Sequence, residues 1–267
     1  MNSIEEVNKP KVSIIMNCFN GEKFLSESLN SVLKQTYKNW ELIFWDNLST
    51  DKSKKIIKSF DDKRIKYFYS DKFLNLYKAR NSAIKKCTGK YILFLDTDDT
   101  WVKNKIEKQV DFLEKNQDFK IVYSNYYINN EIKKKITIRS KKLLPYGHIT
   151  KNLLRDYKLG ILTVCLKKSI FDKFSFNNDY NIIGDFDFFI NLSLKEKIGC
   201  IQLPLAHYRI HDDNYSDRQM KFYIKELSNW LKNHKFLEKD HNLSLFYQRI
   251  YIFKLNVKYY LKKFKFF

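Results

Sequence analysis

Three carboxylates lie within four positions in the stretch YILFLDTDD (91–99), directly after five apolar or aromatic residues. The charges of Asp96, Asp98 and Asp99 repel one another unless a cation or hydrogen bonds compensate them. Hard divalent cations such as Mg²⁺ bind a few carboxylates together with substrate phosphates. Acids also stabilise helix N-termini, but that role needs one carboxylate and this stretch offers three. The cluster therefore predicts a site for a metal ion and a phosphate group.

Two other polar residues, Asn17 and Asp46, also follow apolar segments. Asn17 ends KVSIIMN (11–17) and Asp46 ends WELIFWD (40–46), and both segments read as strands. In open parallel α/β sheets, ligands bind outside the carboxyl ends of the strands. We therefore expect Asn17, Asp46 and Asp96 to gather at one edge of a sheet.

Strand-like and helix-like segments alternate through about residue 125. The apolar runs are continuous, which is typical of strands covered on both faces. This pattern predicts an α/β fold with a mostly parallel sheet flanked by helices. The expected strands are 11–17, 40–46, 64–70, 91–96 and 120–125, and the expected helices are 21–35, 49–60, 75–90 and 100–113, the last capped by Thr100. The less regular second half contains a hairpin or excursion (131–149), a strand (161–168), a helix opened by acids (184–197) and a strand (198–211).

The composition excludes several classes of protein. The 267 residues are 44% hydrophobic, which provides a substantial core and excludes a mainly disordered chain. No run of about 18 apolar residues predicts a membrane span, and the N-terminus lacks the apolar segment of a secretory signal. The four cysteines are scattered, with no CxxC pair, so neither a zinc site nor a disulfide framework is expected. These features favour a reducing cytoplasm.

Four segments of the chain occur in a specific order. They are VSIIMNCFNGEKFLSESLNSVLKQTYKNWELIFWDNLSTD (12–51), ARNSAIKKCTGKYILFLDTDD (79–99), GDFDFFINLS (184–193) and YRIHDDNYS (208–216). Together they resemble the base-binding segment, DxD element, acceptor-side acidic motif and closing Tyr-Arg-x-His segment of bacterial family 2 glycosyltransferases, which have the GT-A fold. The resemblance covers roughly residues 11–216.

The resemblance implies transfer of a sugar from a nucleotide-sugar donor, commonly a UDP-sugar. Phe19 matches the aromatic residue that packs on the base, and Asp46 matches the carboxylate that reads it, commonly through the imide N–H of uracil. Mg²⁺ or Mn²⁺ would neutralise the departing nucleoside diphosphate. The sequence leaves open which of Asp96, Asp98 and Asp99 holds the metal. The residues matched to the donor nucleotide are Asn17, Phe19, Asn20, Asp46, Arg80, Asp96 and Asp98, and those matched to the metal are Asp98, Asp99 and His211.

Asp185 matches the aspartate of the acceptor-side motif, and the resemblance implies that it is the general base. It would take the proton of an acceptor hydroxyl during in-line attack on the anomeric carbon, which inverts that carbon. Asp187 and Arg209 are expected on the acceptor side. The departures from the family pattern are Asn47-Leu48 in place of Asp-Gly, Gly184 in place of Glu and Asn191 in place of Arg.

The C-terminal segment is basic and aromatic. The expected organisation is a GT-A domain (1–216), with a nucleotide-sugar-binding half (about 10–125) and an acceptor-side half (about 126–216), followed by a helical extension (217–267). On a helix, one cationic stripe would contain Lys254, Lys258, Lys262 and Lys265. Such helices bind anionic membrane surfaces, which suits peripheral attachment and a glycan or lipid-linked acceptor in surface polysaccharide or lipooligosaccharide synthesis. The alternative is a helix packed on the domain with a solvated lysine face.

Two other functions compete with glycosyl transfer. A nucleotidyltransferase that makes nucleotide sugars needs a glycine-rich phosphate loop near its first strand, whereas NCFNGEKF (17–24) has one glycine. A nucleic-acid-binding protein is suggested by the net charge of +20 and the 16% aromatic residues. It would not explain acids at strand ends, and the lysine excess also fits a solvated surface. We therefore expect an enzyme that binds no nucleic acid.

Overall fold

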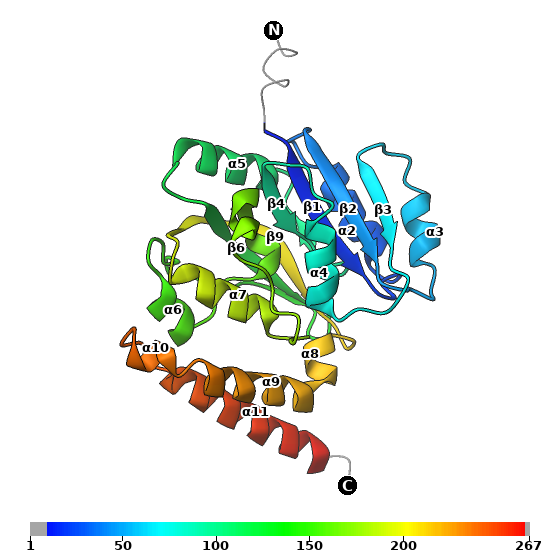
Figure 1. Ribbon diagram of the computed structural model, residues 1–267. Coiled ribbons are helices and arrows are strands. Elements are labelled where there is room, and N and C mark those ends of the chain that lie inside the picture. Colours follow the sequence, from blue (N-terminus) through cyan, green and yellow to red (C-terminus); the bar gives the residue numbers. More distant parts are fainter. Residues whose placement is uncertain (1–9, 265–267) are drawn as a thin grey trace.

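The computed structural model describes residues 10–264 and contains a nine-stranded sheet with helices on both faces (Figure 1). The strand order is β3-β2-β1-β4-β8-β6-β9-β5, and β7 pairs with β6. The strands are β1 (Val12–Cys18), β2 (Trp40–Asp46), β3 (Ile65–Tyr69), β4 (Tyr91–Phe94), β5 (Thr100–Trp101), β6 (Ile121–Asn130), β7 (Lys135–Ile138), β8 (Cys165–Lys167) and β9 (Ile198–Ile210). The helices are α2 (Leu25–Leu33), α3 (Ser53–Lys58), α4 (Leu76–Ile84), α5 (Lys105–Lys115), α6 (Thr150–Arg155), α7 (Gly184–Ser193), α8 (Tyr215–Arg218), α9 (Met220–Asn233), α10 (Phe236–Lys239) and α11 (Phe246–Phe264), with short 3-10 helices η1 (Ile161–Thr163) and η2 (Lys168–Asp172).

The first four strands are parallel, as predicted, and β1, β2 and β3 end together. Cys18 pairs with Asp46, and Asp46 pairs with Tyr69, at the carboxyl ends of these three strands. Alternate residues of β1 enter two different cores: Ile14 packs in the cluster that includes α2 and α5, and Ile15 packs in the cluster that includes α4 and α7. The uninterrupted apolar runs of the sequence therefore reflect strands that are buried on both faces.

Beyond β4 the sheet is mixed, so the prediction of a mostly parallel sheet holds for its first half. β8 runs antiparallel to β4 and β6, and β5 runs antiparallel to β9, whereas β6 and β9 are parallel. The segment predicted as a hairpin or excursion (131–149) contributes one strand, β7, which pairs antiparallel with the preceding strand β6 through a short connection. Thr100 was predicted to cap a helix, but it belongs to β5 and pairs with His207 of β9. The helix α5 begins only at Lys105.

The C-terminal helices α9 and α11 lie as a layer against α6 and α7 (Figure 1). Trp230 of α9 is fully buried, and its ring centroid lies 4.8 Å from that of Phe186 in α7. Leu245 and Leu255 belong to the same hydrophobic cluster as Ile15 of the sheet. The predicted extension is therefore helical but shares its core with the preceding residues.

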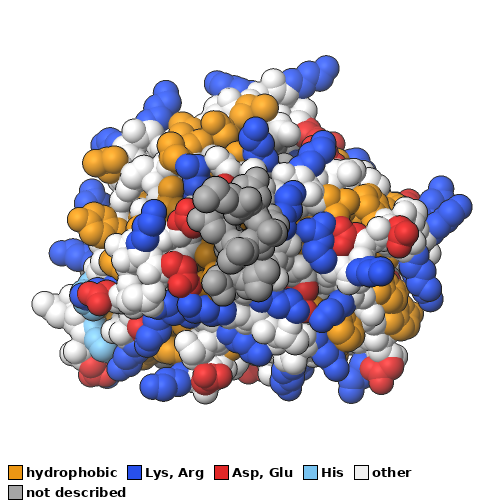
Figure 2. All heavy atoms as spheres, turned by 90° about the horizontal axis from the view of Figure 1, so that it is seen from above, with side chains coloured by type: hydrophobic (Ala, Val, Ile, Leu, Met, Phe, Trp, Pro, Cys, Tyr) orange, Lys and Arg blue, Asp and Glu red, His pale blue; other side chains and the backbone are white. Residues whose placement is uncertain are grey.

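The surface charge is dispersed. Seen from the N-terminal end, Lys and Arg side chains spread over the visible face among Asp and Glu (Figure 2). This distribution supports the interpretation of the lysine excess as a solvated surface. The cysteines at 18, 87, 165 and 200 are free thiols, as predicted. No helix within residues 10–264 is long and apolar enough to cross a bilayer.

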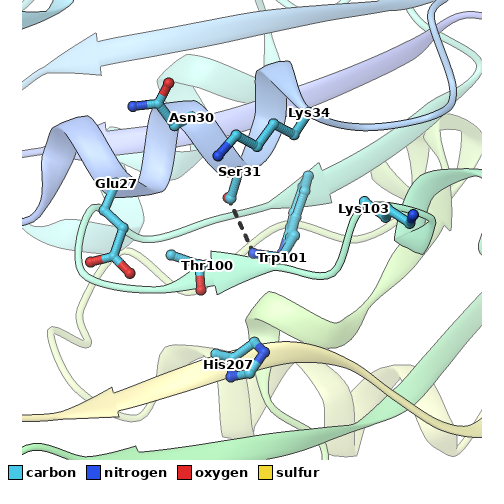
Figure 3. Close-up of a pocket in the computed structure, with 8 residues that line it drawn as sticks. All are labelled: Glu27, Asn30, Ser31, Lys34, Thr100, Trp101, Lys103 and His207. Atoms are coloured by element: carbon cyan, nitrogen blue, oxygen red, sulfur yellow. Dashed lines mark hydrogen bonds between the residues drawn. The ribbon is translucent and has the colours of Figure 1, made fainter.

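A hollow of about 380 Å³ lies between α2, β5 and β9 (Figure 3). Glu27 of α2, Lys34 directly after α2 and His207 of β9 surround it. Ser31 Oγ accepts a hydrogen bond from the Trp101 backbone N–H at 3.1 Å. None of the residues predicted to bind a donor, a metal or an acceptor lines this hollow. It therefore lies outside the candidate active site.

Candidate active site

Asp96 is held by a buried arginine. The Arg80 side chain from α4 is 3% exposed, and its Nη2 lies 2.8 Å from Asp96 Oδ1 and 3.1 Å from Oδ2. Burial lowers the pKa of Arg80, but the charges of Asp96 and Asp185 more than reverse this effect. The Asp96 side chain remains 36% exposed after the end of β4. The pair thus fixes a carboxylate at the sheet edge while leaving it accessible.

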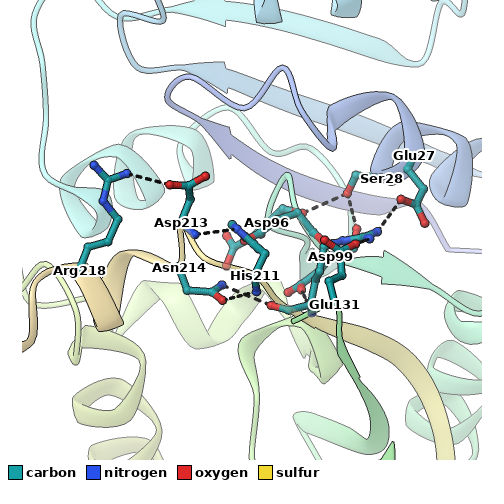
Figure 4. Close-up of polar contacts among 11 residues, drawn as sticks. Glu27, Ser28, Asp96, Asp99, Glu131, His211, Asp213, Asn214 and Arg218 are labelled. Carbon is teal, nitrogen blue, oxygen red and sulfur yellow. Dashed lines mark hydrogen bonds and ion pairs between the residues drawn. The ribbon is translucent and has the colours of Figure 1, made fainter. Parts of the chain in front are cut away.

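His211, directly after β9, lies beside Asp98. The imidazole Nε2 is 3.1 Å from Asp98 Oδ2, and Nδ1 accepts the backbone N–H of Asp213 at 3.2 Å. Figure 4 shows His211 and Asp213 next to Asp96. Burial and the charge of Asp96 raise the pKa of Asp98, and the hydrogen bond with His211 opposes this shift. The fold therefore brings together two of the three predicted metal ligands, which are 113 positions apart in the chain.

A carboxylate and an imidazole within hydrogen-bond distance form a donor set that fits a divalent cation. Among the described residues, no group of three or more His, Cys, Asp or Glu side chains is arranged to hold a metal ion. Mg²⁺ and Mn²⁺ commonly complete their coordination with substrate phosphates and water. Asp98 and His211 therefore fit a cation that arrives with, or is held by, a phosphorylated ligand.

Asp99 is buried inside the turn after β4. It is 3% exposed, and its Oδ1 accepts the backbone N–H of Arg209 at 2.9 Å. The Ser28 hydroxyl of α2 donates to the Asp99 carbonyl (Figure 4). Burial, followed by the charges of Asp98 and Asp96, raises the pKa of the Asp99 carboxyl. These contacts show that Asp99 orders this turn, and its predicted role as a metal ligand stays a prediction.

Arg209, expected on the acceptor side, lies among acidic residues and the Asp98 loop. Its Nε donates to the Asp98 carbonyl at 2.8 Å, and its guanidinium pairs with Glu27 at 2.5 Å and with Glu131. The side chain is 8% exposed and lies 4.5 Å from the ring centroid of Phe24. Arg209 therefore ties the Asp98 loop to β9 and α2.

An exposed aromatic pair stands near the end of β1. Phe19 is 52% exposed and Phe73 is 59% exposed, and their ring centroids lie 4.9 Å apart in an edge-to-face arrangement. Sequence reasoning missed Phe73, because its position in the loop after β3 was its only signal. At the same edge, Asn17 Nδ2 is buried and has no hydrogen-bond partner among the described residues. This surface can receive a flat ring that carries polar groups.

Asp46, predicted to read the donor base, is buried and hydrogen-bonded within the protein. Its Oδ2 accepts the Tyr67 hydroxyl at 2.7 Å, and its Oδ1 accepts the Ser49 backbone N–H at 2.8 Å. Asn20 Oδ1 likewise accepts the backbone N–H of Thr50 at 2.8 Å. These hydrogen bonds let Asp46 and Asn20 order the loop after β2, and the contacts predicted for them with a donor nucleotide stay predictions.

Asp185, in the first turn of α7, lines a cavity of about 560 Å³ between α6, α7, α9 and α11. Its Oδ1 accepts the Phe186 backbone N–H at 2.8 Å and lies 3.2 Å from the Tyr77 hydroxyl. Burial raises the pKa of the Asp185 carboxyl, and the charge of Arg80 is the largest opposing cause. A carboxylate in such surroundings is a stronger base than one in water.

Asp187 binds the C-terminal helices and does not line this cavity. Its Oδ1 accepts the indole N–H of Trp230 at 2.9 Å and the amide of Asn191 at 3.1 Å, and it lies 3.1 Å from His234 Nε2. Asp187 is 6% exposed. Asp187 therefore joins α7 to α9, and its predicted acceptor contact stays a prediction.

Glu226 of α9 orders the loop before Asp185. Its carboxylate accepts the backbone N–H groups of residues 181, 182 and 183 at 2.6, 2.9 and 3.2 Å. The side chain is 5% exposed. No sequence motif marked Glu226, because its function depends on how α9 packs against a loop more than 40 positions earlier.

The model of the family described as Glycosyl transferase family 2 matches residues 13–177, which is more than half of the chain. The chain belongs to this family. It is therefore a glycosyltransferase, as the order of motifs predicted.

Two relatives from Escherichia coli match most of the chain. The UDP-Glc:alpha-D-GlcNAc-diphosphoundecaprenol beta-1,3-glucosyltransferase WfgD is 36% identical over 214 residues, covering 79% of this chain and 81% of the relative. WfaP, a glucosyltransferase with the same named substrates, is 33% identical over 240 residues, covering 90% and 92%.

Solved structures of low sequence identity support the GT-A fold. Staphylococcus aureus TarS (residues 1–349) in complex with UDP-GlcNAc has a TM-score of 0.62 at 17% identity, and the match covers 82% of this chain and 67% of that one. The mannosyltransferase PcManGT from Pyrobaculum calidifontis, in complex with GDP-Man and Mn²⁺, has a TM-score of 0.62 at 14% identity, with coverage of 85% and 66%. Against a longer TarS chain, this chain spans 40% of the length.

The departure of this glycosyltransferase from its family at Gly184 has a steric cause. A Cβ atom at Gly184 would lie 2.5 Å from Cδ2 of the Tyr77 ring. Tyr77 is buried across the start of α7, with its hydroxyl 3.0 Å from the Ile182 carbonyl. Gly184 therefore replaces the frequent Glu because Tyr77 occupies the space.

The departure at Asn47-Leu48 places a leucine in the left-handed region, with φ of 67°. This conformation costs a non-glycine residue about 1 kcal/mol. Asn47 stabilises the loop by exchanging hydrogen bonds of 2.7 and 3.1 Å with the backbone of Leu74. The loop that adjoins the donor edge thus keeps a glycine-like backbone without glycine.

Proposed function

We propose that this protein is an inverting, metal-dependent glycosyltransferase that transfers a sugar from a UDP-sugar to a hydroxyl of a lipid-linked acceptor. The observation that carries the proposal is the clustering of the Arg80–Asp96 pair, the Asp98–His211 pair and Asp185. The activities named for WfgD and WfaP support the substrate classes. Synthesis of a bacterial surface polysaccharide or lipooligosaccharide is the corresponding process.

Asp98 and His211 would hold the divalent cation. Bound Mg²⁺ or Mn²⁺ supplies positive charge that stabilises the departing nucleoside diphosphate. The chain itself contributes the fixed positions of both ligands, since Arg209 anchors the Asp98 carbonyl and the Asp213 N–H orients the imidazole. Asp96, held by Arg80, is the accessible acid that remains for the donor ribose.

Phe19 and Phe73 would provide the surface on which the donor base rests. Both rings are more than half exposed, so a bound base would cover apolar surface that water now contacts. The unpaired Asn17 amide is a hydrogen-bond donor at the same edge. Asp46 would contribute indirectly, because its hydrogen bonds with Ser49 and Tyr67 hold the loop after β2 in place.

Asp185 would act as the general base. The acceptor hydroxyl gives its proton to the Asp185 carboxylate while its oxygen attacks the anomeric carbon of the donor. The bond from that carbon to the diphosphate breaks on the opposite side, so the configuration inverts. The Phe186 N–H and the Tyr77 hydroxyl hold Asp185 Oδ1 in place during this step.

The test combines UDP-glucose, Mg²⁺ or Mn²⁺ and a short-chain alkyl diphosphate of α-GlcNAc as acceptor. We expect a β-linked disaccharide by NMR and loss of the reaction in excess chelator. An α-linked product would contradict inversion. Formation of UDP-glucose from UTP and glucose 1-phosphate would instead identify a nucleotidyltransferase, and tight salt-dependent RNA binding without transfer would identify a nucleic-acid-binding protein.

The outward face of α11 would attach the enzyme peripherally to the inner face of the cytoplasmic membrane. Lys254 and Lys258 lie on this helix among exposed aromatic and apolar side chains. The Lys262 side chain and Lys265 of the predicted stripe lie outside the described residues. The exposed side chains of α11 that do not line the cavity beside Asp185 are Phe246, Phe253, Val257, Tyr260 and Leu261. Together they have the composition of a membrane-surface helix.

Point substitutions test this attachment better than truncation, because Leu245 and Leu255 are core residues. The double variant Phe253→Ser/Leu261→Ser should lower partition into vesicles of phosphatidylglycerol while the melting temperature stays unchanged. The matched control is Ile132→Ser/Leu143→Ser, which alters two exposed apolar residues outside the C-terminal helices. Equal partition of both double variants and the wild type would contradict attachment through α11.

A further inference from the structure

Two buried polar atoms without partners belong to residues that line the cavity beside Asp185. Among the described residues, the Tyr157 hydroxyl and Gln248 Oε1 are buried and make no hydrogen bond. The Gln248 amide nitrogen donates to the Leu154 carbonyl, which orients the side chain. A buried polar group without a hydrogen-bond partner destabilises the folded protein. Such groups need an explanation in a native protein, and a polar ligand in the cavity provides one.

The walls of the cavity suit a sugar ring. The rings of Tyr157 and Phe186 lie 5.1 Å apart, centroid to centroid, and the hydroxyls of Tyr223 and Tyr251 lie 3.3 Å apart. All four side chains line the cavity together with Asp185. A sugar has apolar C–H faces that pack on aromatic rings and hydroxyls that need hydrogen-bond partners. The volume of about 560 Å³ lies in the usual range for small-molecule sites.

Cationic side chains also line the cavity. Arg139 is committed within the protein, since it pairs with Asp156 at 3.1 Å and donates to the Tyr157 carbonyl at 3.0 Å. Arg155 and Lys254 are exposed, and among the described residues neither forms an ion pair with a carboxylate. These two cations are available to an anionic part of the ligand.

We propose that this cavity binds the acceptor as a glycosyl diphosphate. The sugar lies between the aromatic walls and bonds Tyr157 and Gln248, and the diphosphate pairs with Lys254 and Arg155. This inference rests on the proposed function, because it brings the nucleophilic hydroxyl to Asp185. It also makes α9 and α11 part of the acceptor site, since they supply one wall of the cavity.

Acceptor binding without donor tests the charge recognition. Two probes, octyl α-GlcNAc diphosphate and neutral octyl α-GlcNAc, are titrated into the full-length protein by calorimetry. We expect the diphosphate to bind at least about tenfold more tightly, because charge-assisted hydrogen bonds contribute about 1.5–3 kcal/mol. Lys254→Gln and Arg155→Gln should each remove most of this preference. Lys258→Gln, one turn further along α11 and outside the cavity lining, should retain it.

Tyr157→Phe tests the sugar contact. Removal of an unpartnered hydroxyl should leave the melting temperature unchanged or raised, while affinity for both probes falls about fivefold. Tyr260→Phe, an exposed tyrosine outside the cavity, should change neither quantity. A lower melting temperature with unchanged affinity would show that the Tyr157 hydroxyl is structural and would overturn its assignment to the sugar.

Hydrolysis of UDP-glucose in the same variants separates the two proposals. If all variants bind both probes as the wild type does while hydrolysis persists, the acceptor assignment is overturned and the proposed function stands. If the variants show the expected binding pattern but the wild type neither hydrolyses nor transfers from any UDP-sugar, the cavity assignment stands and the donor or reaction is wrong. Equal wild-type affinity for both probes would also overturn diphosphate recognition.

Discussion

The sheet edge proposed to bind the donor and the cavity proposed to bind the acceptor are built in different ways. The donor edge takes its polar groups mainly from the ends of strands and from α4 in one sheet half. The acceptor cavity collects residues from α6, α7, α9 and α11, over positions 139 to 254. At the donor edge, the carboxylates of Asp46 and Asp99 are bonded within the protein. In both regions, neutral buried atoms lack a hydrogen-bond partner among the described residues: Asn17 Nδ2 at this edge, and the Tyr157 hydroxyl and Gln248 Oε1 in residues that line the cavity.

This difference indicates a division of tasks. A rigid, internally bonded edge keeps the charged groups of the reaction in place, which limits reorganisation during transfer. A cavity with unsatisfied polar groups leaves its hydrogen bonds to the ligand, which favours discrimination between acceptors. We expect substitutions at the reacting centre to act mainly on kcat, and substitutions in the cavity wall to act on acceptor affinity.

The largest expected effect is at Asp185, where the two regions meet. Asp185→Asn should lower kcat by about 10²–10⁴, because general-base catalysis contributes an effect of this size. Donor affinity should stay unchanged, as Asp185 lines the acceptor cavity. Single-turnover transfer and UDP-glucose titration measure the two quantities. Transfer at the wild-type rate would show that another group takes the proton.

Because the pKa of Asp185 is raised, both activity and stability should depend on pH in a characteristic way. Transfer needs the ionised carboxylate, so kcat/KM should fall with decreasing pH through a pKa above the ordinary value for aspartate. For stability the sign is opposite: a folded-state pKa above the unfolded value favours the protonated form, and that contribution is lost as pH rises through the folded pKa. Asp185→Asn should therefore melt at a higher temperature than the wild type at neutral pH, by calorimetry.

Substitutions at Asp98 and Asp99 should distinguish a loss of activity from a loss of stability. Asp98→Asn should lower kcat by about 10²–10³, as expected for the loss of one electrostatic contact to the leaving group, and should weaken Mn²⁺ binding. Because the side chain is 30% exposed, the protein should remain folded. Asp99→Asn is the contrasting variant, since it should mainly lower the melting temperature. Equal loss of Mn²⁺ binding in both variants would restore Asp99 as a ligand.

Glu226 tests whether the C-terminal helices support catalysis. Glu226→Gln weakens the acceptance of three backbone N–H groups before Asp185. We expect about a tenfold lower kcat with unchanged KM for UDP-glucose, together with a lower melting temperature. Glu238→Gln removes a carboxylate that pairs with Arg249 on α11 and serves as the matched control. If both variants show the same small change, the loop does not depend on Glu226.

The smallest effect on activity is expected at Glu41, which lies near the amino end of β2, whereas Asp46 ends this strand at the donor edge. Glu41 accepts hydrogen bonds from Ser13, Lys66 and Thr88 and pairs with Lys11. Burial would raise its pKa, but these bonds hold the pKa well below its ordinary value. Glu41→Gln should lower the free energy of unfolding by about 2–3 kcal/mol at neutral pH and leave kcat unchanged.

The pH dependence of this effect has a defined sign. A depressed folded-state pKa stabilises the protein above the unfolded pKa, and the contribution is lost as pH falls toward the folded value. The stability difference between wild type and Glu41→Gln should therefore shrink below about pH 4, the ordinary range for glutamate. Urea unfolding at pH 7 and pH 3.5 measures it. A constant difference would mean that the Glu41 charge does not contribute.

The first sheet half was predictable because its signals are local. Continuous apolar runs marked β1, β2 and β4, and strand ends placed Asn17 and Asp96 at one edge. The mixed second half was not, because the direction of β8 between β4 and β6 depends on pairings between distant segments. Thr100 shows the same limit: a polar residue before a helix pattern reads as a cap, yet pairing with β9 makes it a strand residue.

The sequence by itself determined the family, the order of elements in the donor half, and the acids that reach the sheet edge. These follow from hydrophobic periodicity and motif order, which are properties of neighbouring residues. Tertiary structure decided which of those groups remain free to act. Arg209 meets Asp98 across 111 positions, and Asp187 meets Trp230 across 43. A buried carboxylate takes whichever partner the packing supplies, so the roles of Asp46, Asp99 and Asp187, and the acceptor cavity itself, emerge only in the folded chain.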